Sequence, residues 1–94
     1  MKYRVTLSNS ALRFYDSLNA IARKQIDDAV KDLLNYYEHG TPINIDLSKM
    51  HDDKKYSGCF RLRTGSYRIV FIPKRTELVI FVLNMDKRQD VYKK

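Results

Sequence analysis

The sequence predicts an α+β fold of two layers, in which a pair of helices packs against one face of an antiparallel β-sheet. Three observations lead to this prediction: an alternating segment near the start, two segments with helical spacing, and three segments rich in β-branched and aromatic residues near the end. A chain of 94 residues is long enough for one hydrophobic core, so we expect a single domain over residues 1–94. The composition, with 44% hydrophobic and 12% aromatic residues, is typical of a packed globular chain.

Residues 2–7 are expected to form a strand, because Tyr3, Val5 and Leu7 alternate with polar side chains. Such alternation is typical of a strand with one buried and one exposed face. The cluster Ser-Asn-Ser at 8–10 consists of residue types that favour helix N-caps. A helix is therefore expected to begin directly after the strand.

Two helices are predicted next, and the first covers residues 11–18, where apolar side chains recur at helical spacing. Asn19 either interrupts this helix or caps the next one. The second helix covers residues 20–37, and its apolar stripe consists of Ala22, Ile26, Ala29, Val30, Leu33 and Tyr37. Gly40 and Pro42 end it, because glycine suits the left-handed C-terminal position and proline cannot continue a helix. We expect the two helices to form an antiparallel hairpin.

Residues 43–57 show no sustained periodicity and are predicted to be mostly loop, with at most a short turn at 46–50. Three strands follow, at residues 58–63, 67–73 and 77–85, all rich in Val, Ile, Phe and Tyr. The segments between them, Thr64-Gly65-Ser66 and Lys74-Arg75-Thr76, are short enough for hairpins. The predicted order is therefore β-α-α-β-β-β, ending in a three-stranded antiparallel meander.

The hairpin segment at residues 60–71, FRLRTGSYRIVF, mixes arginines with large apolar side chains. Strand side chains alternate between faces, so the length of the turn decides on which face Arg68 lies. A two-residue turn, either Thr64-Gly65 or Gly65-Ser66, puts Arg61, Arg63 and Arg68 on one face and Phe60, Leu62, Tyr67, Ile69 and Phe71 on the other. A three-residue turn would put Arg68 among the apolar side chains. We predict the two-residue turn, because a shift by one residue would bury an arginine against the helices.

Positive charge is concentrated in the C-terminal part of the chain. Residues 1–53 contain seven Lys/Arg and eight Asp/Glu, a net charge of −1, whereas residues 54–94 contain eleven and three, a net charge of +8. No acidic residue stands within residues 54–76. Such a segment favours binding of phosphate or of an acidic partner, and arginine presents a planar fork of donors that suits both. The alternative is that solvated arginines pair with carboxylates from loops: Asp52, Asp53 or Asp86.

The composition disfavours several classes of function. The longest apolar run, residues 78–83, is far shorter than the roughly 20 residues of a membrane-spanning helix, and residues 1–10 lack the apolar region of a signal peptide, so we expect a soluble cytoplasmic protein without membrane contact. One cysteine, Cys59, and two separated histidines offer no metal-ligand spacing, so neither a metal nor another cofactor is expected. No serine-histidine-aspartate set, paired-carboxylate arrangement or phosphate loop is present. An enzyme built on this chain must use Arg, Lys and Tyr side chains.

The order of elements and two motifs resemble the RelE/ParE toxin superfamily of bacterial and archaeal toxin-antitoxin systems. The first motif is the hairpin L-R-x-G-x-Y-R-[IV]-x-[FY] at residues 62–71, and the second is the K-R…V-Y ending at residues 87–92. The third strand, ELVIFVLNM, and the closing DKRQDVY extend the resemblance over nearly the whole chain. The resemblance implies a RelE-like fold and the toxin component of a type II system.

The resemblance also implies an activity, that of a ribosome-dependent endoribonuclease, or mRNA interferase, which cleaves messenger RNA in the ribosomal A site without a metal ion. Its catalytic positions match Arg61 and Arg68 on the sheet and Arg88 and Tyr92 in the terminal motif. RNA binding is expected from a second set of basic residues: Lys54, Lys55, Arg63 and Lys87. The sequence departs from the lysine-rich form of this site at Cys59, where a lysine often stands two residues before Arg61.

These side chains suit the expected chemistry. Cleavage of RNA by its own 2′-hydroxyl requires a base, stabilisation of the phosphorane charge and an acid for the 5′-oxygen. Arginine is a poor base but a permanent cation, so Arg61 and Arg68 are expected to stabilise the phosphate charge. Tyr92, if held among cations, would have a lowered pKa and serve as the base. Arg88 is expected to act as a clamp or as the acid.

Two other functions are compatible with the resemblance. Members on the ParE side share the fold but inhibit DNA gyrase, and a toxin without catalysis would act only as an antitoxin-binding module. Retention of the four residues matched to the catalytic positions favours RNA cleavage over gyrase inhibition. In each case we expect an acidic antitoxin that wraps the domain in a hetero-oligomer and brings carboxylates to the arginines.

Overall fold

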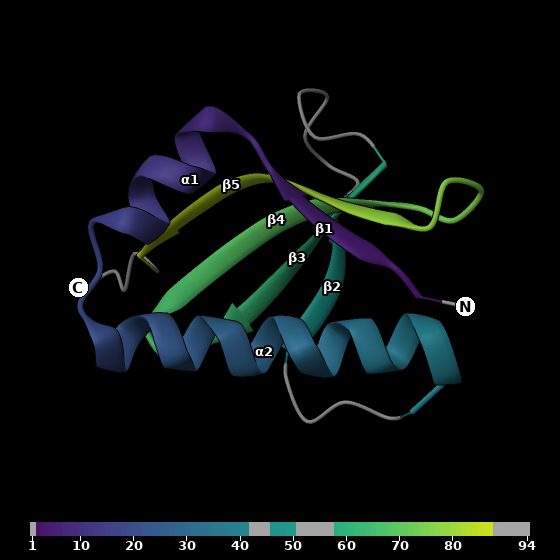
Figure 1. Cartoon of the computed structure of the whole chain (residues 1–94), viewed down its shortest axis with the longest axis horizontal. Helices are drawn as coiled ribbons and strands as arrows, with labels where there is room; N and C mark the ends of the chain where they lie inside the picture. Colours follow the sequence, from purple (N-terminus) through teal and green to yellow (C-terminus); the bar gives the residue numbers. More distant parts are fainter. Residues whose placement is uncertain (1, 42–45, 51–57, 88–94) are drawn as a thin grey trace.

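The computed structural model describes residues 2–41, 46–50 and 58–87 of the chain. The elements in chain order are β1 (Arg4–Leu7), α1 (Asn9–Asp16), α2 (Ala20–His39), β2 (Asp46–Met50), β3 (Cys59–Thr64), β4 (Tyr67–Lys74) and β5 (Val79–Lys87). The five strands form one sheet in the order β1-β5-β4-β3-β2. Figure 1 shows the long helix α2 lying across the sheet and α1 beside β5. The predicted α+β fold with two layers is confirmed.

The first and last described strands are neighbours in this sheet. β1 runs parallel to β5, with Val5 in register with Ile80 and Leu7 with Val82. All other neighbouring strands are antiparallel. Two parallel strands cannot be joined by a tight turn, so the chain between them must cross over the sheet. Here α1 and α2 form the first part of that connection, and they lie against one face of the sheet.

The helix boundaries follow the capping residues that the sequence predicts. The Ser8 hydroxyl accepts a hydrogen bond from the Ala11 N–H at 3.1 Å, so α1 begins at Asn9 rather than at the predicted residue 11. The Asn19 side chain accepts one from the Ala22 N–H at 2.9 Å and caps α2. At the other end Gly40 has a left-handed φ of 71° and donates to the Tyr36 carbonyl. Neither helix in the described part of the chain is long and apolar enough to span a bilayer.

The hydrophobic core lies between the helices and the inner face of the sheet. Its largest fully buried side chains come from α2, β3, β4 and β5, and they include Ile26, Leu33, Leu62, Ile69, Phe71, Ile80 and Val82; α1 contributes the smaller Ala11. Phe71 stacks on Phe60 with ring centroids 5.9 Å apart and meets Tyr37 edge-on at 6.4 Å. Leu62 is in register with Ile69, and Phe60 with Phe71, so these four apolar residues of the arginine-rich hairpin face the helices.

The prediction of loop or turn for residues 46–50 is wrong, because this segment forms strand β2. It pairs antiparallel with β3, with Leu47 in register with Leu62. Its sequence, DLSKM, lacks the β-branched and aromatic residues that mark a strand, so propensity gave no signal. Pairing with the edge of β3 holds the segment extended, which is a tertiary effect.

The turn between β4 and β5 is also longer than predicted. Lys74 pairs with Val79, so the turn spans residues 75–78 instead of Lys74-Arg75-Thr76. Leu78 has a φ of 57°, a left-handed conformation that is uncommon outside glycine and asparagine. This register places Ile80 and Val82 in the core, and burial of these side chains offsets the local strain.

The described part of β5 contains a β-bulge. Phe71 pairs with Val82 and Val70 with Asn84, so Leu83 has no partner in the register of β4 and β5. The Leu83 carbonyl accepts a hydrogen bond of 2.6 Å from the Ser8 hydroxyl, which also caps α1. After the bulge Met85 faces the core and Asp86 faces the opposite side of the sheet.

Candidate anion-binding face

The turn of the β3–β4 hairpin determines where the arginines lie. Thr64 pairs with Tyr67, which leaves Gly65-Ser66 as a two-residue turn, and the prediction is confirmed. Gly65 has a φ of 55°, and a Cβ at this position would collide with the side chain of Gln25 on α2. The left-handed turn conformation is the main reason for glycine here, because the end of the flexible Gln25 side chain can move aside.

Arg61, Arg63 and Arg68 lie together on the outer face of the sheet, opposite the helices. Arg63 pairs with Arg68, and the neighbouring pair, Leu62 and Ile69, points into the core. Because side chains alternate along a strand, Arg61, Arg63 and Arg68 point to the opposite face. All three arginine side chains are half-buried rather than fully exposed. We call these three residues the arginine face.

A bidentate ion pair links the arginine face to β5. Arg68 is in register with Asp86; its Nε donates to Oδ1 and its Nη2 to Oδ2, both at 3.0 Å. The two side chains are 31% and 38% exposed, so solvent screens the pair only in part. The alternative drawn from the sequence, in which an arginine pairs with a carboxylate of the chain, therefore holds for Arg68 and Asp86. Asp86 was considered as a partner from a loop, but it is a residue of strand β5.

Arg63, Arg68 and Asp86 lie side by side across three strands, and their charges partly compensate. Arg63 and Arg68 are directly opposite each other on β3 and β4, and like charges in that position destabilise a sheet. Asp86 stands on the other side of Arg68 and offsets this repulsion. The fork of the guanidinium also fixes the orientation of Arg68.

Cys59 belongs to the same face by alternation but does not carry chemistry there. Its side chain is only 2% exposed, and Val70, in register with Arg61, is 4% exposed. Burial raises the pKa of the Cys59 thiol, so the neutral form predominates at pH 7. A neutral, buried thiol replaces neither the charge nor the reach of a lysine.

Farther along β4 and β5 the outer face becomes apolar. Ile72 pairs with Phe81 and both are half-buried, while Lys74 holds its Nζ 5.7 Å from the centre of the Phe81 ring. Ile72 is four residues from Arg68, or about 13 Å along an extended strand. The outer face thus combines a cationic end near the hairpin turn with an apolar aromatic end.

The structure does not bring every predicted residue to this face. Lys87 is exposed and pairs with Tyr67, so alternation along β5 places it on the helix side of the sheet, away from Arg68. The remaining candidates lie outside the described residues: Lys54, Lys55, Arg88 and Tyr92. Within the described ranges, no group of three or more His, Cys, Asp or Glu side chains is placed to hold a metal ion.

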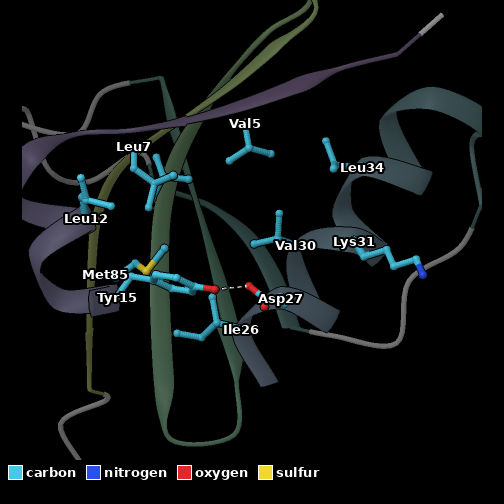
Figure 2. A pocket seen from close by; sticks show the side chains of 11 residues that line it. Val5, Leu7, Leu12, Tyr15, Ile26, Asp27, Val30, Lys31, Leu34 and Met85 are labelled. Atoms are coloured by element: carbon cyan, nitrogen blue, oxygen red, sulfur yellow. Dashed lines mark hydrogen bonds between the residues drawn. The ribbon is translucent and has the colours of Figure 1, made fainter. Parts of the chain in front are cut away.

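An open apolar cavity of about 350 Å³ lies on the helix side of the sheet. Figure 2 shows Leu12 and Tyr15 at one side of the cavity and Val30 and Leu34 at the other. The Tyr15 hydroxyl donates to Asp27 Oδ1 at 2.7 Å, and this bond to a carboxylate raises the pKa of Tyr15. Sequence reasoning missed the cavity, because the exposure of its lining residue Leu12 is set by packing and leaves no signal in the sequence. Its lining is mainly apolar and does not contribute to the arginine face.

Comparison with known families gives a match over most of the chain. A family model described as the ParE toxin of the type II toxin-antitoxin system, parDE, matches residues 5–92. A search of curated proteins gave no match.

Several solved structures share the fold at low sequence identity. A chain of the archaeal RelE-RelB complex from Pyrococcus horikoshii OT3 matches with a TM-score of 0.73 and 22% identity, covering 97% of this chain and 100% of that one. The E. coli RelBE toxin-antitoxin complex matches with a TM-score of 0.63 and 22% identity, covering 93% and 98%. The YoeB-YefM complex from Staphylococcus aureus matches with a TM-score of 0.67 and 17% identity, covering 94% and 99%. Identities this low support the fold alone.

Proposed function

The chain belongs to the ParE toxin family of type II toxin-antitoxin systems, and we propose that it acts as an endoribonuclease that cleaves messenger RNA in the ribosomal A site. The observation that carries the proposal is the arginine face, on which Arg61, Arg63 and Arg68 are gathered by the two-residue turn. Three guanidinium groups on one side of a rigid hairpin are well suited to a phosphate chain.

The three arginines take two roles in the proposed reaction. Arg61 and Arg68 stabilise the negative charge that develops on the phosphorus-bound oxygens as the 2′-hydroxyl attacks. Arg63, which lies directly opposite Arg68, positions the RNA backbone.

The proton transfers are assigned to the C-terminal motif. We take Tyr92 as the base that activates the 2′-hydroxyl and Arg88 as a clamp or as the acid for the 5′-oxygen, with Lys54 and Lys55 contributing to RNA binding. The assignments of Arg88 and Tyr92 rest on the terminal motif that the sequence shares with RelE-like toxins, and those of Lys54 and Lys55 rest on their place in the basic segment that begins at residue 54. The proposed reaction requires no metal ion.

An acidic antitoxin is the proposed protein partner. The chain carries a formal net charge of +7, and several structures with the same fold are toxin-antitoxin complexes. Carboxylates of the antitoxin would bind the guanidinium forks of the arginine face and so compete with RNA for the same donors.

The decisive experiment is 5′-end mapping of messenger RNA on translating ribosomes with the wild-type chain, with Arg68→Ala and with Arg13→Ala. Arg13 is an exposed arginine on α1, so its removal changes the net charge equally but on another surface. We expect cleavage to fall by about 10² to 10³-fold in Arg68→Ala, since a transition-state donor is lost, and to be unchanged in Arg13→Ala. Undiminished cleavage by Arg68→Ala would contradict the assignment.

Inhibition of DNA gyrase is the second candidate, and the match to the ParE family model favours it. Induced expression in cells separates the two. Growth arrest with cut messenger RNA supports the nuclease, whereas arrest with DNA damage and intact messenger RNA supports the gyrase inhibitor. Absence of arrest would indicate a chain that only binds an antitoxin.

A further inference from the structure

We propose that Asp86 is a positioning residue that acts through Arg68 and limits how tightly the arginine face binds RNA phosphate. The inference rests on the proposed function in one respect, namely that the anion bound by this face is RNA. Asp86 occupies, in the absence of RNA, the edge of the guanidinium that a phosphate would bind.

The contact has the geometry of a phosphate complex. Two parallel N–H···O bonds of 3.0 Å join Nε and Nη2 of Arg68 to the two carboxylate oxygens of Asp86. Arginine binds a phosphate with the same fork and the same pair of parallel bonds. An RNA phosphate that binds this edge of Arg68 must therefore replace the Asp86 carboxylate.

The position of Asp86 depends on the bulge at Leu83. Without the extra residue, the register of Phe71 with Val82 would continue and put Met85, not Asp86, opposite Arg68. With the bulge, Met85 enters the core at 4% exposure and Asp86 reaches the arginine. The carboxylate is thus placed on the outer face by the architecture of β5.

Two consequences follow for RNA binding. Asp86 removes one unit of positive charge from the face, and it makes phosphate binding at Arg68 an exchange instead of a simple addition. Replacing the carboxylate by an amide should therefore strengthen binding and add about one phosphate contact. For single-stranded RNA each such contact steepens the dependence of log K on log salt by about 0.7.

The test is the binding of a single-stranded 2′-O-methyl oligonucleotide to the purified full chain, measured over a series of salt concentrations. This probe cannot be cleaved because it lacks the attacking hydroxyl. Asp86→Asn should bind about threefold or more tightly than the wild type, with a salt dependence steeper by about 0.7. Asparagine retains an oxygen that can accept from Nε, which favours retention of the fold.

A matched control removes the same charge elsewhere. Asp28 on α2 pairs with Lys24 at 3.1 Å and is well exposed, so Asp28→Asn changes the net charge equally on the helix side. We expect it to leave affinity and salt dependence within error of the wild type. An equal increase in oligonucleotide affinity in Asp28→Asn would mean that Asp86 acts only through the net charge of the chain, and would overturn the proposal.

The role of Arg68 is tested by a double-mutant cycle. In the Arg68→Gln background, Asp86→Asn should have at most a small effect, because the residue through which Asp86 acts is gone. An undiminished gain in that background would show that Asp86 acts independently of Arg68. Weaker oligonucleotide binding by Asp86→Asn alone would show that the carboxylate supports binding, which also contradicts the proposal.

The binding experiment on Asp86 and the cleavage experiment on the proposed nuclease can succeed or fail independently. Tighter binding by Asp86→Asn in a protein that does not cut messenger RNA would support this inference and remove the nuclease. Normal cleavage together with unchanged oligonucleotide binding by Asp86→Asn would support the nuclease and remove this inference.

Discussion

The two faces of the β3–β4 hairpin are built from alternate residues of one segment, yet different forces act on them. On the inner face, Leu62, Ile69 and Phe71 are completely buried against the helices. On the outer face, Arg63 and Arg68 are directly opposed and half-buried, and Asp86 from the next strand offsets their repulsion. The comparison teaches that a single turn can assign stability to one face and binding to the other.

This separation has an experimental consequence. Apolar burial contributes stability in proportion to the area removed from water, whereas partly exposed charges contribute little to stability. Changes on the inner face should therefore alter unfolding, and changes on the outer face should alter binding.

The largest difference in the free energy of unfolding is expected between variants of the neighbouring residues Leu62 and Arg63, which lie on opposite faces. Leu62→Ala removes a fully buried side chain and should lower the free energy of unfolding by about 2 to 5 kcal/mol. Arg63→Gln removes a charge that faces Arg68 and should change it by about 1 kcal/mol or less while weakening oligonucleotide binding. Urea denaturation and binding titrations measure the two quantities. A loss of stability of similar size in both variants would refute the separation of the faces.

An intermediate effect is expected at Ser8, whose hydroxyl links the helix layer to the β5 bulge. Ser8→Ala removes both the cap of α1 and the hydrogen bond to the Leu83 carbonyl, so it should lower the free energy of unfolding by about 2 kcal/mol. Asn19→Ala removes only the cap of α2 and should cost about 1 kcal/mol. Thermal and urea denaturation can rank the two. Equal losses would mean that the Leu83 bond adds nothing to the cap.

The smallest effect concerns Tyr37, which packs edge-on against Phe71 on the inner face. Burial raises the pKa of Tyr37, an effect that the nearby Arg75 guanidinium partly opposes. Because the folded state holds the proton more tightly than the unfolded state, stability is fully present below about pH 10 and falls as the pH rises through the raised pKa.

Tyr37→Phe should therefore show a smaller loss of stability than the wild type between about pH 9 and about pH 11. Tyr15→Phe should also reduce the fall of the unfolding free energy with rising pH, because the hydrogen bond to Asp27 raises the pKa of Tyr15. The measurement is the free energy of unfolding of the wild type and of each variant across this pH range. A slope that Tyr37→Phe leaves unaltered would be inconsistent with the buried tyrosine as its source.

Local sequence signals predicted those features that depend on near neighbours. Ser8, Asn19 and Gly40 marked the helix ends because capping is a contact within one turn of the chain. The alternation in the hairpin predicted the two-residue turn, because only that turn keeps Arg68 out of the core.

Features that depend on partners far along the chain were missed or misplaced. Strand β2 has no strand propensity of its own and exists through pairing with β3. Lys87 was grouped with the RNA-binding residues, but the bulge at Leu83 reverses the alternation after it and places this lysine on the helix side.

The sequence by itself determined the two faces of the arginine-rich hairpin and the helices that cover one of them, because side-chain alternation and helix capping are local rules. Only the tertiary structure decided what stands opposite those arginines. The β5 bulge, with the Leu83 carbonyl bound by Ser8 from the other end of the chain, places Asp86 against Arg68. A register set by contacts over such a distance leaves no local pattern in the sequence, and the charge of the face depends on it.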